Sequence, residues 1–70
     1  MGMNSKADPV ILDGTVLHTT TGAVLFNFGG AAGKEVWLPK SQLRYCSTYE
    51  IGETAEIEIP YWLAENKGLV

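Results

Sequence analysis

The chain is poor in the residue types that carry most enzyme and metal chemistry. Its 70 residues include one cysteine, Cys46, and one histidine, His18. A single cysteine excludes an intrachain disulfide, and these two side chains fall short of the four ligands of a structural zinc site. No apolar run approaches the ~20 residues of a membrane-spanning helix. We therefore expect no metal, no cofactor and no membrane partner, with stability supplied by a packed apolar core or by self-association.

Positive charge is also scarce, since five Lys and Arg residues face eight Asp and Glu residues, for a net charge of −3. This balance disfavours broad electrostatic capture of a nucleic-acid backbone. The acidic excess lies in the last third, so that a small basic spot can persist around Lys40 and Arg44. The lone cysteine and the lack of a secretory signal predict a cytoplasmic location.

Hydrophobic residues make up 46% of the chain, which is typical of a packed core. Short apolar and β-branched runs at 10–18, 23–28 and 34–38 predict three antiparallel strands in a meander. Within the first run, alternation places Val16 and His18 on one face, and Asp13-Gly14 predicts a β-bulge. After it, the turn at 19–22 ends in Gly22, which we expect to supply a positive φ. Within the third run, alternation places Val36 and Leu38 toward the core and Trp37 on the other side.

The second half predicts one further strand and one helix. Pro39 should end the third strand, and 39–43 has the length of one 3₁₀ turn. A turn at 51–53 precedes "TAEIEI" (54–59), whose alternation places Ala55, Ile57 and Ile59 inward. The segment 60–68 predicts a short helix that starts at a proline, ends at a glycine, and docks through Trp62 or Leu63.

The predicted fold is mainly β: a small bent antiparallel sheet or partial barrel, of the SH3-like or OB-like sort, with a short C-terminal helix. We expect residues 1–8 to form a disordered leader because they are polar, small and unpatterned. Residues 9–70 then form a single small β-rich domain.

The segments "EVWLPKSQL" and "GETAEIEIPYWLAENKGL" together resemble short uncharacterised proteins of bacteria and phages. The shared pattern is V-W-[IL]-P-K-S-Q, an acidic spacer, and I-P-x-W-[LA]-A-x-x-K-G-L. The resemblance covers roughly the second half of the chain. It implies an accessory role of the mobile-element type, and it supplies no catalytic residues.

Isolated polar residues do not assemble into a catalytic pattern. No serine or cysteine nucleophile is tied to His18 by spacing, and Cys46 is expected to be a small buried filler. Glu56 and Glu58 share one strand face without a third ligand, so we expect them to face water. The glycine-rich stretch 29–33 lacks the Gly-Lys-Ser/Thr ending of a phosphate loop and predicts a hairpin tip. These features predict that the protein is not an enzyme.

Large rings give the strongest functional signal, since two tryptophans and three tyrosines are many for so small a core. A β-surface with exposed rings and cations can grip a peptide or stack single-stranded bases. Burial of Trp37 under the helix against Trp62, or burial of the rings in a homodimer, are the alternatives. The candidate binding residues, for protein or nucleic acid, are Trp37, Lys40, Arg44, Tyr45, Tyr49 and Trp62.

Two functions follow from this set of residues. The first is a small non-enzymatic protein-interaction module, able to self-associate, with an unidentified protein partner. The second is single-stranded nucleic-acid binding through Trp37, Lys40 and Arg44, which has weaker support because the acidic balance disfavours it.

Overall fold

A computed structural model describes residues 8–29 and 33–70 of the chain. The expected disordered leader, apart from Asp8, lies outside the described residues. So does the middle of the expected hairpin tip at 29–33.

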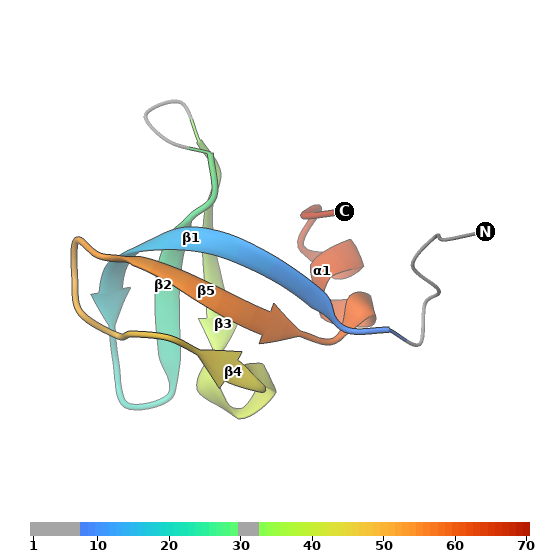
Figure 1. The fold of residues 1–70 in the computed structure, drawn as a ribbon, viewed down its shortest axis with the longest axis horizontal. Helices are drawn as coiled ribbons and strands as arrows, with labels where there is room; N and C mark the ends of the chain where they lie inside the picture. The colour runs from blue at the N-terminus through green and yellow to red at the C-terminus, as the bar shows by residue number, and fades with distance from the viewer. Residues whose placement is uncertain (1–7, 30–32) are drawn as a thin grey trace.

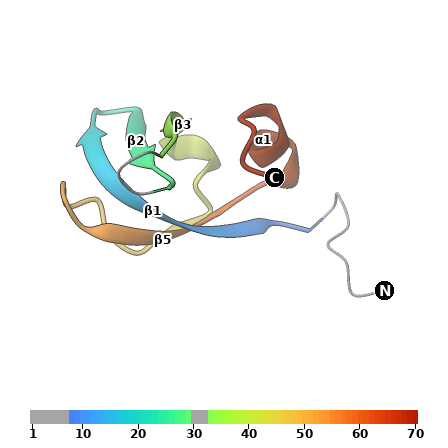
Figure 2. The same cartoon turned by 90° about the horizontal axis from the view of Figure 1, so that it is seen from above.

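Five strands form one antiparallel sheet in the spatial order β3-β2-β1-β5-β4. The sheet bends strongly but does not close, so β3 and β4 lie at its two edges (Figure 1, Figure 2). This confirms the predicted mainly β fold, in the form of a bent open sheet with one short C-terminal helix. The element bounds are β1 Val10–Thr19, β2 Ala23–Asn27, β3 Glu35–Pro39, η2 Lys40–Gln42, β4 Tyr45–Cys46, β5 Thr54–Ile59 and α1 Tyr61–Asn66.

Strand β1 is the long central strand, and its bulge lies elsewhere than predicted. It pairs with β5 without interruption from Val10 to Thr15, so the expected bulge at Asp13-Gly14 is wrong. The register with β2 shifts instead between Val16 and His18. Because the shift adds one residue, Val16 points inward whereas His18 is exposed, and the prediction that both share a face is also wrong.

Glycine at position 14 serves packing rather than a bulge. Gly14 is buried, and a Cβ built on it would lie 2.7 Å from the ring of Phe28 and 3.3 Å from the Cβ of Phe26. The missing side chain therefore leaves the space that the Phe28 ring occupies. Phe28 in turn stacks at a tilt on Phe26, with ring centroids 5.5 Å apart.

The turn between β1 and β2 is closed by a threonine side chain. The backbone N–H of Thr20 donates to Ala23 O over 2.8 Å, and the Ala23 N–H donates back to the Thr20 Oγ1 over 3.0 Å. Gly22 does not have a positive φ, so that expectation is wrong. A threonine hydroxyl that bonds the nearby backbone stabilises this turn without left-handed geometry.

Strand β4 was not predicted. Tyr45 and Cys46 pair with Glu58 and Ile57 of β5. Adjacent backbone bonds run from the Arg44 N–H to Glu58 O and from the Ser47 N–H to Glu56 O. Two residues are too few for alternation to be visible in a sequence.

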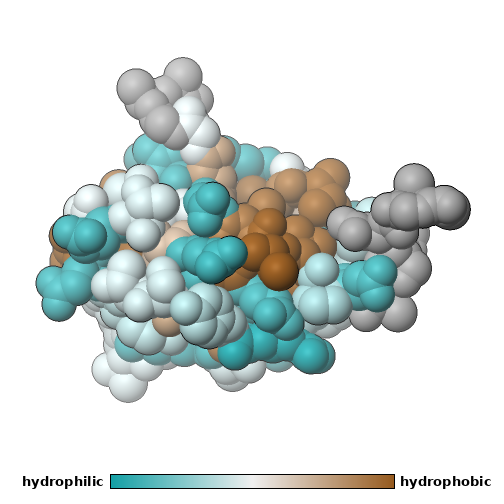
Figure 3. Space-filling model, in the orientation of Figure 1, coloured by the Kyte–Doolittle hydropathy of each residue, from teal (hydrophilic) through white to brown (hydrophobic). Residues whose placement is uncertain are grey.

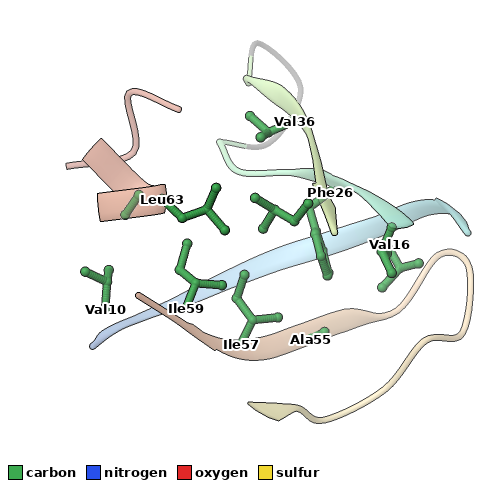
Figure 4. Close-up of a cluster of buried hydrophobic side chains, with 11 residues drawn as sticks. Val10, Val16, Phe26, Val36, Ala55, Ile57, Ile59 and Leu63 are labelled. Carbon is green, nitrogen blue, oxygen red and sulfur yellow. The ribbon is translucent and has the colours of Figure 1, made fainter. Parts of the chain in front are cut away.

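The core lies inside the bend of the sheet and is closed at one end by α1 (Figure 4). Alternation predicted its strand residues correctly, because Val36, Leu38, Ala55, Ile57 and Ile59 are all buried. Helix α1 docks through Leu63 and Ala64. The remaining buried hydrophobic residues are Val10, Val16, Val24 and Phe26.

Among the residues that the structure describes, two glycines have the left-handed backbone that ends an element. Gly52, at φ 92°, makes the predicted turn before β5. Gly68, at φ 73°, follows α1, where the Leu69 N–H donates to Ala64 O over 2.8 Å. A positive φ suits glycine because it has no Cβ, so the predicted stop at position 68 is confirmed.

Candidate interaction surface

Trp37 lies on the outer side of the edge strand β3. It pairs with Leu25 of β2, and Leu25 pairs with His18 of β1, so the three side chains form one row across three strands. Trp37 is 43% exposed. The alternative in which Trp37 is buried under the helix against Trp62 is therefore wrong. The reason is strand parity, since Val36 and Leu38 take the two inward positions of β3.

His18 contacts Trp37 and was missed as a member of this surface. The two rings meet edge to face, with centroids 6.1 Å apart and planes at 78°. We refer to His18, Leu25 and Trp37 as the Trp37 surface. Sequence reasoning could not find His18, because its outward direction depends on the β-bulge after Val16.

Lys40 and Tyr49 form a second pair of candidate residues. The Lys40 ammonium lies 5.2 Å from the centroid of the Tyr49 ring, a cation–π contact that joins the start of η2 to the loop before β5. Lys40 directly follows β3 in the chain. Its backbone N–H donates to Gly22 O at the end of the β2–β3 pair. Lys40 is thus three residues after Trp37 in the chain. Tyr49 remains 43% exposed despite the contact.

The other three candidates lie on different elements. Arg44 and Tyr45 belong to the β4 edge, where both are exposed and Tyr45 pairs with Glu58. Trp62 lies on α1 and is 57% exposed. The expectation that Trp62 could anchor the helix is wrong, and Leu63 takes that role because the helix presents only its Leu63–Ala64 side to the core.

The fold changes the ionisation of the Cys46 thiol. Burial raises the pKa of its thiol above the ordinary value of 9.0, and this outweighs the opposite effect of the Thr48 backbone. The Sγ lies 3.1 Å from Thr48 O and donates to it. A protonated, half-buried thiol is a poor nucleophile. Its place beside the core agrees with the expected filler role.

Two further observations concern the described part of the chain. Across residues 8–29 and 33–70, no group of three or more His, Cys, Asp or Glu side chains could hold a metal ion. Within the same ranges, no helix has the length and apolar character needed to cross a membrane.

Three comparisons with known proteins were made against family models, curated proteins and solved structures. None of these comparisons gives a match to the chain.

Proposed function

We propose that this chain is a small non-enzymatic protein-interaction module of the cytoplasm, with an accessory role of the kind that the mobile-element resemblance implies. The observation that supports it most directly is the exposure of Trp37 in the middle of a regular strand. An exposed tryptophan leaves apolar area in water that a small domain could otherwise bury in its core. Trp and Tyr are enriched where proteins bind each other.

The placement of the rings favours protein contact over catalysis. Trp37 is restrained on one side by His18, and Tyr49 is restrained by Lys40. Rings that are already held lose little conformational entropy when a partner covers them. Aromatic side chains can thus give contact area at low cost on a chain this small.

A peptide-display selection tests this proposal. A random library is panned on the immobilised protein and, in parallel, on a Trp37→Ala variant. We expect sequences to be enriched on the natural chain and to lose binding on the variant. A selection with no enrichment, or with equal enrichment on both proteins, would contradict a Trp37-centred binding function.

Self-association is the form of protein interaction that requires only copies of this chain. Light scattering on a size-exclusion column, run over a wide concentration range, measures it. A mass that stays at 7.6 kDa at the highest concentration would remove self-association and leave binding to other proteins.

Single-stranded nucleic-acid binding is the second candidate, favoured by the cation that lies beside the Tyr49 ring close to Trp37 in the chain. Stacked rings and nearby cations are the common means of holding single strands. In a Trp62→Phe background, an oligo-dT strand should quench Trp37 fluorescence in low salt, and added salt should restore it. An unchanged emission in low salt would rule this candidate out.

A further inference from the structure

A different part of the outer surface combines apolar and acidic side chains. On the outer side of β1, β5 and β4, Ile11 lies opposite Glu58, and Glu58 lies opposite Tyr45. In the neighbouring row, Asp13 lies opposite Glu56. We refer to these five residues as the β1–β5–β4 face.

The apolar residues of this face are unusually exposed. Ile11 is 61% exposed and Tyr45 is 51% exposed, although they lie in one row with only Glu58 between them. Figure 3 looks onto this side of the molecule and shows an apolar area near the start of β1, with hydrophilic residues to its left and below it. Apolar surface with a polar rim is typical of interaction sites.

The carboxylates of the face repel one another. Asp13 and Glu56 are directly opposite on neighbouring strands, an arrangement that destabilises a sheet when the charges have the same sign. In the part of the chain that the structure describes, no lysine or arginine forms an ion pair with Asp13, Glu56 or Glu58. A cationic partner would therefore remove a repulsion that the free domain carries.

We propose that the β1–β5–β4 face binds a basic segment of a partner protein, one that carries an apolar side chain next to Lys or Arg. The apolar side chain would cover Ile11 and Tyr45, and the cation would lie between Glu58 and the Asp13–Glu56 pair. Charge complementarity selects this occupant over a second copy, since each copy has a net charge of −3. The inference rests on the proposed function and assigns it a second surface, separate from the Trp37 surface.

A labelled peptide of alternating lysine and leucine, seven residues long, is the probe. Fluorescence anisotropy in low salt measures its binding to the natural chain, and a glutamate–leucine peptide of the same length is the control. We expect the lysine peptide alone to bind, with an affinity that falls as salt is added. Absence of binding in low salt, or equal binding of both peptides, overturns the inference.

Two charge-matched variants locate the peptide. Glu56→Gln with Glu58→Gln removes two carboxylates from the face, whereas Glu50→Gln with Glu53→Gln removes two exposed carboxylates outside it. Both variants change the net charge from −3 to −1, by removing two negative charges. We expect the first variant to weaken binding at least about tenfold more than the second. Equal weakening would mean nonspecific attraction to an acidic protein and would overturn the inference.

Two single variants separate this inference from the proposed function. Ile11→Thr should lower the affinity for the lysine peptide severalfold, as expected for the loss of one apolar contact. Trp37→Ala should leave that affinity unchanged. If Trp37→Ala abolishes peptide binding instead, the probe binds the Trp37 surface, and only the assignment of the β1–β5–β4 face fails. If library selection succeeds on Trp37 while the lysine peptide does not bind, the proposed function stands without this second surface.

Discussion

The rings of His18 and Trp37 meet edge to face, with 6.1 Å between the ring centroids and 78° between the planes. The two residues are far apart in sequence and meet only because the β1–β2 register shifts by one residue after Val16. Trp37 is thereby both exposed and restrained. A restrained ring on the surface is what a binding role for β3 requires.

Replacement of His18 by alanine should free the indole. In a Trp62→Phe background, where Trp37 is the sole tryptophan, His18→Ala should lower the steady-state fluorescence anisotropy of Trp37. The free energy of unfolding should fall by only about 0.5–1 kcal/mol, since an edge-to-face pair at the surface contributes that much. His18→Phe keeps a ring in place and is the control. An unchanged anisotropy in His18→Ala would mean that the contact does not restrain Trp37.

Gly14 and Gly22 should respond to alanine in opposite ways. A Cβ on Gly14 would lie 2.7 Å from the Phe28 ring, so Gly14→Ala must displace that ring and should cost about 1–3 kcal/mol of unfolding free energy. Gly22 has no atom within 4 Å of a Cβ, and its φ is not positive. Gly22→Ala should therefore be neutral or stabilise by up to about 1 kcal/mol. Urea unfolding of both variants checks this, and a greater loss in Gly22→Ala would refute the assigned turn.

Trp62 and Leu63, two adjacent residues of α1, should differ in the same assay. Leu63 is 4% exposed and fixes the helix to the core, so Leu63→Ala should lose about 2–5 kcal/mol. Trp62→Ala, at a largely exposed position of the same turn, should change stability by about 0.5 kcal/mol or less. A large loss in Trp62→Ala would show that the indole packs on the domain.

The free energy of unfolding should decrease at alkaline pH because of Cys46. Burial raises the pKa of the folded thiol, so the unfolded chain loses the proton first as the pH rises. The contribution is complete below the pKa of the unfolded thiol and is lost as the pH rises through the folded value. Thermal unfolding should therefore show a steeper alkaline decline in the natural chain than in Cys46→Ala.

Alkylation of Cys46 measures the same effect directly. The iodoacetamide rate should rise with pH along a curve displaced to higher pH than that of the chain in concentrated urea. Coincident curves in the two conditions would contradict the raised pKa.

Patterns of neighbouring residues predicted the inward side chains of two strands and the limits of the helix. The alternation in β3 and β5 gave the correct inward residues, and Pro60 and Gly68 bracket the helix as predicted. The position of the bulge depends on the register of β1 against β2, which no local pattern contains. The packing of the Phe28 ring over Gly14 is likewise a contact between distant segments of the chain. Strand β4 exists because β5 offers it a pairing edge, since two residues cannot specify a strand alone.

The candidate site was predictable as a set of residue types but not as an arrangement. The excess of rings identified Trp37, Tyr45, Tyr49 and Trp62, and all four are exposed. Their distribution over β3, β4, the loop before β5 and α1, and the pairing of Trp37 with His18, arise from strand register and the bend of the sheet. The exposure of Ile11 could not be predicted from the sequence, because an isoleucine that faces water has the same sequence pattern as a buried strand isoleucine.

Acrylamide quenching of Trp37 in a Trp62→Phe variant tests most directly the central claim that Trp37 lies on an accessible surface. We expect red-shifted emission and efficient quenching at low protein concentration, with less quenching when a selected peptide or a second copy covers the ring. Blue-shifted emission with weak quenching in the isolated monomer would place Trp37 in the interior and contradict this claim.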